Sequence, residues 1–171
     1  MAEPDTIYRV MVLYMLDAVD FPLTNTQISD FLLEKDYTDY FSIQKILNGL
    51  VNAGLIECTT THNNTQYFLT NEGKLTLPYF EDKLNDSIIA DIKQYLKDNK
   101  LKLKEENRAF AAYIPTVNDS YDVRCQIQES SHPVIDITIN VKTKEQAKAI
   151  CSNWTKENSN VYTYLMDVLL Q

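Results

Sequence analysis

The chain has 171 residues, 44% of them hydrophobic and 23% charged, which is typical of a folded protein with one sizeable core or two small ones. Its net charge of −8 disfavours a surface that attracts polyanions as a whole. No apolar run approaches the roughly 20 residues of a membrane span, and acids stand where a signal peptide has basic residues. We therefore expect a cytoplasmic protein that makes no membrane contact.

Three helices are predicted before residue 54. Apolar residues recur at helical spacing from Ile7 onward, which predicts a first helix over 5–18. Thr24, followed three residues later by Gln27, forms a capping box that predicts the start of a second helix. After a turn at 36–38, a third helix is expected over 39–53, and Gly54 ends it in a left-handed conformation.

A β-hairpin is predicted after the third helix. The segments 55–61 and 66–69 are rich in Thr and aromatic residues, and the residues between them favour a turn. The T-x-E-G segment that begins at Thr70 is expected to close the hairpin. Two short helices, a glycine stop and a hairpin, in this order over 23–77, are typical of a winged helix-turn-helix, which usually binds duplex DNA. We expect such a domain over residues 1–80.

A longer helix is predicted over 85–103, within a connecting segment of residues 81–105. Ile89, Ile92 and Leu96 lie near a spacing of three and four residues along it. Such a seam either packs within the chain or joins two subunits, and its length of about two heptads does not decide between them. We expect a homodimer, with these three residues as the candidate contact.

The remaining residues, 106–171, are predicted to form a C-terminal domain of three antiparallel strands and two helices. Apolar and polar residues alternate along the three strands. The residues expected to face the core are Phe110, Ala112, Ile114, Tyr121, Val123, Cys125, Ile127, Ile135, Ile137, Ile139 and Val141. Thr143 and Gln146 form a second capping box before a helix that buries Ala147, Ile150, Cys151 and Trp154. A separate helix after Asn160 is expected to bury Tyr164, Leu165, Val168 and Leu169. The predicted fold class is α+β.

No motif for catalysis, cofactor binding or metal binding is found in the sequence. The three cysteines are widely separated and form no C-x-x-C pair, and His62 and His132 lie in predicted turns without a partner at ligand spacing. Three glycines cannot build a phosphate-binding loop. We expect neither an enzyme nor a bound cofactor or metal.

The candidate DNA-binding residues lie on the third helix and at the hairpin tip. Gln and Asn side chains can pair with adenine, and Lys can reach guanine or a phosphate. The candidates are Tyr40, Ser42, Gln44, Lys45, Asn48, Asn63 and Asn64. Residues 1–77 hold four basic side chains against ten acidic ones, however, and affinity for DNA comes largely from neutralising phosphates.

Two functions therefore stay open. The first is a DNA-binding transcriptional regulator that acts as a homodimer, with the C-terminal domain used for dimerisation or sensing. The second is a winged helix that binds another protein without DNA, because Tyr40 and Phe41 at the start of the third helix are of the type enriched at protein interfaces.

Three segments carry a resemblance to known families: LTNTQISDFLLE, SIQKILNGLVNAGLIE and TQYFLTNEGKLTL. They resemble the winged-helix regulators of the PadR-like and MarR-like groups. The whole chain, with its Ala147 to Trp154 segment and its final helix, is similar to the bacterial DUF4364 family. The resemblance implies a winged-helix domain with a C-terminal extension, and it implies no particular activity.

Overall fold

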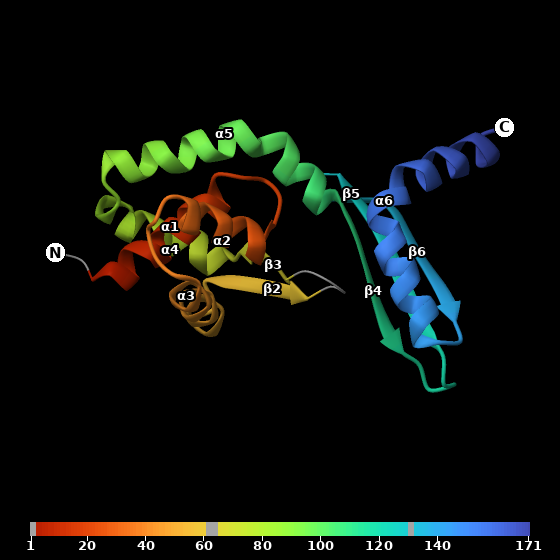
Figure 1. Cartoon of the computed structure of the whole chain (residues 1–171). Helices are drawn as coiled ribbons and strands as arrows, with labels where there is room; N and C mark the ends of the chain where they lie inside the picture. The colour runs from red at the N-terminus through yellow and green to blue at the C-terminus, as the bar shows by residue number, and fades with distance from the viewer. Residues whose placement is uncertain (1–2, 61–64, 130–131) are drawn as a thin grey trace. The chain divides into compact units, whose positions relative to one another are not determined.

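The computed structural model describes residues 3–60, 65–129 and 132–171 (Figure 1). It is a mixed α+β structure with two antiparallel three-stranded sheets, which confirms the predicted fold class. Two compact units are present. The first contains described residues up to 104, and the second begins at 105. The expected boundary at residue 80 lies inside the first unit, which also contains the whole of the helix predicted over 85–103.

The first unit combines five α-helices with a small sheet. Its elements in chain order are α1 (Pro4–Asp17), β1 (Leu23–Thr24), α2 (Asn25–Glu34), α3 (Tyr40–Asn52), β2 (Ile56–Thr60), β3 (Thr65–Leu69), α4 (Asn71–Phe80), a 3-10 turn η1 (Glu81–Lys83) and α5 (Asp86–Arg108). The strand order is β1-β3-β2, with both pairs antiparallel. The predicted helices and hairpin are confirmed, whereas β1, of two residues, was not predicted.

Local signals place the helix ends as the sequence predicts. Thr24 Oγ1 accepts a hydrogen bond from the Gln27 amide at 3.1 Å, and Gln27 Oε1 accepts one from the Thr24 amide at 3.0 Å. This reciprocal pair is the capping box, and it satisfies two amides that the first turn of α2 leaves without helical partners. Gly54 follows α3 with φ +73°, a left-handed conformation that glycine adopts without a steric penalty.

The segment after β3 is a helix start rather than a hairpin turn. Thr70 is the N-cap of α4, and its Oγ1 accepts a hydrogen bond from the Gly73 amide at 3.0 Å. The Thr70 hydroxyl also lies 2.9 Å from the carbonyl oxygen of Leu55. The prediction of a closing turn was wrong because threonine three residues before glycine suits a turn and a helix cap equally well.

One hydrophobic core holds the first unit together. Its fully buried side chains include Met11, Met15, Phe31, Ile43 and Ile92, contributed by four different helices. Burying an aliphatic or aromatic side chain of this size contributes about 1.5–3 kcal/mol, so packing of these helices outweighs their individual helix propensities.

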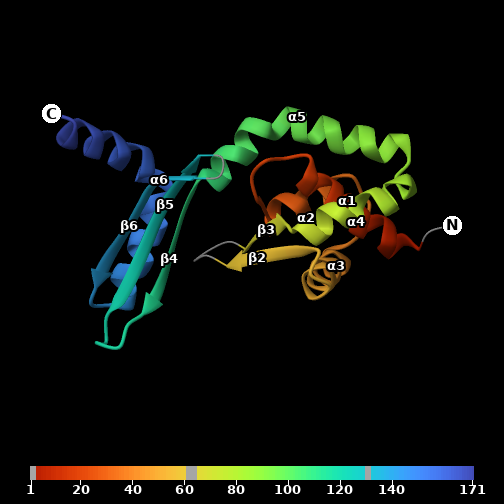
Figure 2. The same ribbon diagram turned by 180° about the vertical axis from the view of Figure 1, so that it is seen from behind.

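The second unit is a sheet with one helix on it. Its elements are β4 (Ala109–Pro115), β5 (Tyr121–Glu129), β6 (His132–Val141) and α6 (Lys144–Leu169), and the strand order is β4-β5-β6. Figures 1 and 2, taken from opposite sides, show the first part of α6 lying along one face of this sheet. Ala147, Cys151 and Trp154 are buried there, and the indole Nε1 of Trp154 donates to the Gln126 carbonyl oxygen at 3.1 Å.

The predicted inward face of β4 was wrong by one residue. Ala111 is buried opposite Cys125, whereas Phe110 and Ala112 lie on the other face and Ile114 is exposed. Nearly every residue of β4 is apolar, so the two alternating sets are equally hydrophobic and the strand alone does not choose between them. Pairing with β5, whose alternation is unambiguous, selects the face.

The two predicted C-terminal helices are one continuous helix of 26 residues. The Asn158 side chain, where a break was expected, donates to the carbonyl oxygens of Trp154 at 2.9 Å and Thr155 at 3.1 Å. Its polar group is thus satisfied within the helix, and no proline or glycine interrupts the backbone. Tyr164, Val168 and Leu169, predicted to be buried, are exposed.

Among the described residues, no helix has both the length and the apolar character that crossing a membrane requires.

Candidate nucleic-acid interface

The candidate interface is the outward face of α3. Ile43, Ile46, Leu47 and Leu50 turn toward the core, which leaves the other side of the helix on the surface. Asp39 caps the helix: its carboxylate accepts from the Ser42 amide at 2.9 Å and from the Ser42 hydroxyl at 3.0 Å. These hydrogen bonds hold the pKa of Asp39 below its ordinary value. The amide and hydroxyl of Ser42 are therefore already hydrogen-bonded at the start of α3. The Asp39 carboxylate beside them keeps its negative charge.

Gln44 is engaged by another side chain. Its amide and that of Asn25 on α2 form two reciprocal hydrogen bonds, of 2.8 and 3.0 Å. Asn25 also lies 3.3 Å from the hydroxyl of Tyr67 on β3. The amide pair fixes the orientation of Gln44 and uses one N–H and one oxygen lone pair, so one of each remains for a ligand.

Lys45 is exposed and forms a long ion pair. Its Nζ lies 3.8 Å from a carboxylate oxygen of Asp5, which is half-exposed in the first turn of α1. An exposed pair with this separation contributes well under about 1 kcal/mol, because water screens it and two flexible side chains must be ordered. The lysine can therefore exchange Asp5 for another anion at little cost.

Arg9 on α1 is a second cation beside α3 that the sequence analysis missed. A Cβ atom built at Gly49 would lie 3.3 Å from the Arg9 guanidinium, so the arginine passes directly over that position. Lys45 and Gly49 are four residues apart and share one side of α3, which places both cations along that side. No local sequence signal reveals this, because the crossing of α1 and α3 brings Arg9 there.

The remaining candidates on α3 are also at the surface. Asn48 is exposed on the outward face. Tyr40 and Phe41 are exposed at the start of the helix with their rings edge to face at 6.3 Å, and Phe41 retains 85% of its accessible surface. The predicted hairpin-tip residues Asn63 and Asn64 lie outside the described residues. The structure thus brings the five α3 candidates onto one helix, with polar, cationic and aromatic groups side by side.

The expected dimer seam on α5 packs within the chain. Ile92 is fully buried, Leu96 is buried, and Ile89 packs against the same core of the first unit. The α5 helix is also held to α2, since the Tyr95 hydroxyl donates to the Gln27 carbonyl oxygen at 3.4 Å. Two of the three predicted contact residues, Ile92 and Leu96, are thus engaged in the core of the first unit, whereas Ile89 is partly exposed.

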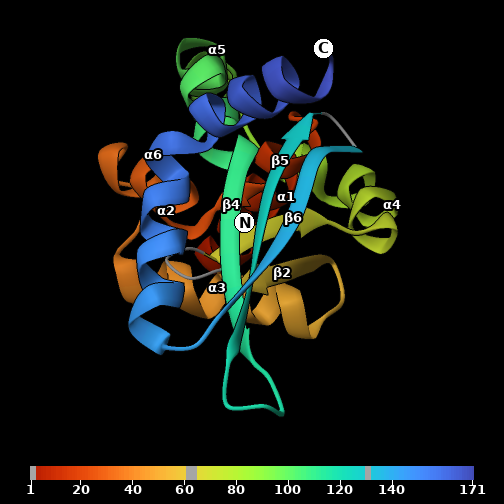
Figure 3. The ribbon, with the colours of Figure 1, turned by 90° about the vertical axis from the view of Figure 1, so that its right-hand side faces the viewer.

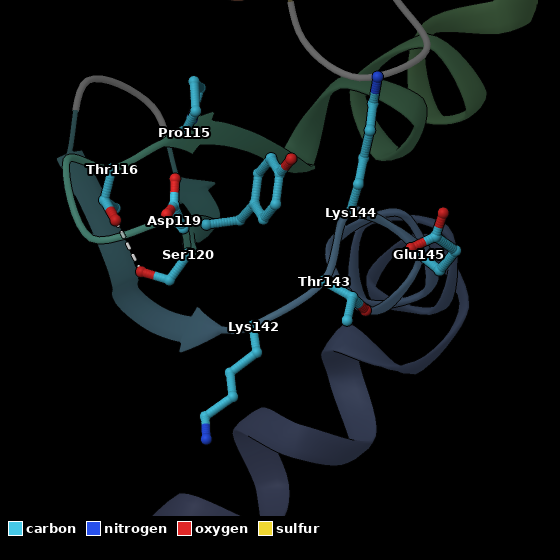
Figure 4. A pocket seen from close by; sticks show the side chains of 9 residues that line it. Pro115, Thr116, Asp119, Ser120, Lys142, Thr143, Lys144 and Glu145 are labelled. Atoms are coloured by element: carbon cyan, nitrogen blue, oxygen red, sulfur yellow. Dashed lines mark hydrogen bonds between the residues drawn. The ribbon is translucent and has the colours of Figure 1, made fainter.

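A polar pocket of about 390 Å³ lies in the second unit between the β4–β5 turn and the start of α6 (Figure 4). Figure 4 shows the Lys142 and Lys144 side chains pointing in opposite directions, so their charges do not converge on one ligand. The amide of Gln146, in the first turn of α6, is already bonded to the Thr143 hydroxyl at 3.2 Å. A second pocket, of about 570 Å³, shares Thr116, Asp119, Ser120 and Lys142 with the first. The geometry assigns neither of them a ligand.

Reactive or metal-binding groups do not gather in the part of the chain that the structure describes. No set of three His, Cys, Asp or Glu side chains in that part could hold a metal ion. Burial raises the pKa of the Cys125 thiol to about 11 and also raises that of Cys151. Both thiols thus stay protonated near neutral pH and are poor nucleophiles, whereas Cys58 is exposed on β2.

Comparison with known proteins gives a family and no activity. A family model described as "Domain of unknown function (DUF4364)" matches residues 8–169, a range that spans both units. No curated protein and no solved structure matches the chain.

Proposed function

The chain belongs to the DUF4364 family, and from its own residues we propose that its first unit is a winged helix-turn-helix that binds duplex DNA and regulates transcription. In this proposal α3 is the helix that enters the major groove, and the β2–β3 hairpin is the wing. We also propose that the first unit is related to the PadR-like and MarR-like regulators and that the protein is cytoplasmic.

The arrangement of elements supports this assignment. The chain order of helix, short strand, two helices and hairpin, with β1 added to the hairpin beside β3, is the order expected of a winged helix. The proposed binding of DNA depends on the exposed face of α3. It presents Lys45 and Asn48 outward, with Arg9 alongside, and these side chains can reach phosphates and base edges.

The charges near α3 set the expected strength of binding. Lys45 and Arg9 are the two cations available for phosphate contacts, and acidic residues outnumber basic ones in the first unit. Binding to random-sequence DNA should therefore be weak and should be lost as the salt concentration rises. Because the pair between Asp5 and Lys45 is long and exposed, a phosphate can take the place of the carboxylate. Asp5 then competes with DNA for Lys45, and removing its charge should strengthen binding.

The test is fluorescence anisotropy of a labelled random duplex, measured between about 50 and about 200 mM salt, a range over which phosphate contacts are lost. We expect Lys45→Gln to weaken binding and to lower the slope of log K against log salt by about 0.9, the value for one phosphate contact. Asp5→Asn should tighten binding. The matched control is Lys97→Gln, which removes the same charge from an exposed position on α5. Absence of binding at the lowest salt, or equal effects of the two lysine variants, would overturn the proposal.

A second candidate function is binding of a protein partner through the same helix. The exposed aromatic pair of Tyr40 and Phe41 favours it, since a phenyl ring with 85% of its surface in water gains most from contact with an apolar partner. Phe41→Ala distinguishes the two functions. If α3 binds DNA through phosphates, this variant keeps the salt slope of the wild type. If α3 binds a protein, it loses the partner that the wild type retains in a pull-down, and DNA has no effect.

A further inference from the structure

The side chain of Asn25, in the first turn of α2, joins α2 to α3 and to β3. The two helices pack against each other, and both can be followed in Figures 1 and 3. Nδ2 of Asn25 donates to Gln44 Oε1 at 2.8 Å and to the Tyr67 hydroxyl at 3.3 Å. Its Oδ1 accepts from Gln44 Nε2 at 3.0 Å and from the Ser29 hydroxyl at 3.1 Å. A primary amide has two N–H groups and two oxygen lone pairs, so Asn25 is fully satisfied.

The surroundings of Asn25 hold it in this position. Ser29 retains only 4% and Tyr67 only 5% of its accessible surface. The capping box fixes the start of α2 one residue before Asn25. Moving the Asn25 amide would break several hydrogen bonds at once, in a place where two of the partners are buried. Asn25 is therefore a rigid partner for Gln44.

The pair between Asn25 and Gln44 occupies one particular edge of the Gln44 amide. When two amides exchange two hydrogen bonds, each uses the N–H on the same side as its own oxygen, together with the lone pair that faces the same way. A glutamine that reads adenine with two hydrogen bonds uses this same edge, because it donates to N7 and accepts from the N6 amino group. The remaining N–H and lone pair of Gln44 point to opposite sides of the amide. While the pair is formed, Gln44 can make single contacts but not the two-bond contact with adenine.

Opening the pair on DNA would bring no net gain in hydrogen bonds. Two bonds to Asn25 would be exchanged for two bonds to adenine, and Asn25 would be left with one N–H and one lone pair without a partner. Asn25 and Gln44 are both only partly exposed, and an unpartnered polar group in such a place is unfavourable. The closed pair is therefore favoured on DNA as well as in the free protein.

We propose that Asn25 is a positioning residue that withholds the Gln44 amide from base readout, so that α3 contacts duplex DNA without a two-bond contact between Gln44 and adenine. The inference rests on the proposed binding of DNA by α3. Removal of Asn25 should therefore create a base preference, which a loss of structure cannot do.

The experiment is selection of bound sequences from a pool of random duplexes at about 50 mM salt, where phosphate contacts are still strong. It compares the wild type with Asn25→Ala and with the double variant Asn25→Ala, Gln44→Ala. We expect Asn25→Ala to enrich adenine at a position where the wild type has no preference, and the double variant to lose this enrichment. Exchanging that A·T pair for G·C should then weaken binding of Asn25→Ala by about 5- to 150-fold, the effect of one bidentate contact, and leave the wild type nearly unchanged.

The matched control is Ser29→Ala, which removes a different hydrogen bond of the same Asn25 amide and leaves both bonds to Gln44 in place. This variant should keep the base preference of the wild type. Asn25→Ser is a second test variant, because a single hydroxyl cannot close the two-bond ring and serine is well suited to the start of a helix. Circular dichroism verifies that each variant is folded.

Failure of this inference differs from failure of the proposed function. Folded Asn25→Ala and Asn25→Ser variants that bind DNA with the wild-type preference would overturn the inference alone, because the freed Gln44 amide would then read no base. A new preference in Ser29→Ala would also overturn it, since loosening of α2 would be the cause. A wild-type preference for adenine that Gln44→Ala removes would show that the pair opens on DNA. Absence of any binding would overturn the proposed function of α3 and this inference with it.

Discussion

Replacing Gly73 by alanine tests the contact that joins α4 to the end of β3 and to the start of the hairpin. A Cβ atom at this position would lie 2.1 Å from the Leu55 carbonyl oxygen and 2.8 Å from Cδ1 of Leu69. The first of these is a backbone atom, which cannot rotate away. The same carbonyl oxygen accepts a hydrogen bond from the Thr70 amide at 3.2 Å, and it shares the single proton of the Thr70 hydroxyl, 2.9 Å away, with the carbonyl oxygen of Gly54 at 2.7 Å. The added methyl group therefore displaces the atom that anchors the N-terminus of α4.

The expected magnitude follows from opposing contributions. Overpacking costs about 1–3 kcal/mol, and weakening two hydrogen bonds to one carbonyl costs about another 1–2 kcal/mol. Alanine gains about 0.5–1 kcal/mol over glycine inside a helix, and Gly73 is within α4. We expect Gly73→Ala to lower the free energy of unfolding of the first unit by about 1–4 kcal/mol.

The other two glycines supply matched controls. At Gly49 the nearest atom to a new Cβ is the mobile end of Arg9 at 3.3 Å, so Gly49→Ala should be neutral or stabilising by up to about 1 kcal/mol. At Gly54 no atom lies within 4 Å, and the cost of about 1 kcal/mol comes from its left-handed φ alone.

Urea unfolding followed by far-UV circular dichroism measures all three variants. Trp154 is the only tryptophan and belongs to the second unit, so its fluorescence serves as an internal reference. A Gly73→Ala variant as stable as Gly49→Ala would refute the reasoning, because it would mean that the backbone near Leu55 moves aside without loss.

Two further predictions concern titration and thiol chemistry. Arg124 donates to Asp136 at 2.9 Å through Nε and at 2.6 Å through a terminal nitrogen, and these bonds, together with one from the Gln126 side chain, lower the pKa of Asp136 from 3.8 to about 2. Since the folded-state pKa is the lower one, the pair stabilises the fold above about pH 4, and this contribution is lost as the pH falls toward 2. Carbon-detected NMR titration should return the pKa of Asp136 toward 3.8 in Arg124→Gln, and an unchanged pKa would contradict the assigned cause. In the folded protein we expect a thiol reagent at neutral pH to modify Cys58 rapidly and to leave Cys125 and Cys151 unmodified until the chain unfolds; rapid loss of all three thiols would contradict the burial described here.

The parts of the fold that were predicted correctly depend on short-range signals. Thr24 and Gln27 are three residues apart, as are Thr143 and Gln146, and both capping boxes are present as expected. By contrast, β1 exists only because Leu23 pairs with Tyr67, far along the chain. The inward face of β4 likewise depended on its register with β5. A single sequence carries no direct record of such long-range pairings.

The candidate site was likewise predicted where short-range signals define it and missed where long-range contacts do. The outward face of α3 followed from helical periodicity, and its residues were identified in advance. Their neighbours were not: Gln44 meets Asn25, and Lys45 meets Asp5, through the packing of α3 against α2 and α1. These contacts determine how much of each side chain is available, and only the packed structure supplies them.

Asp39 and Asp5, two acids beside α3, each stabilise the start of a helix. This structural role bears on the choice between the two functions. Asp39 caps α3, and Asp5 lies in the first turn of α1, where a negative charge interacts favourably with the helix dipole by about 0.3–1 kcal/mol. Both are explained by helix formation, so the acidic total of the unit overstates how strongly the face of α3 repels a phosphate. Asp5→Asn separates these roles: it should cost the first unit a fraction of a kcal/mol in stability and strengthen DNA binding through Lys45. A variant that loses stability without gaining affinity would show that Asp5 serves only α1, and would favour the protein-binding function of α3.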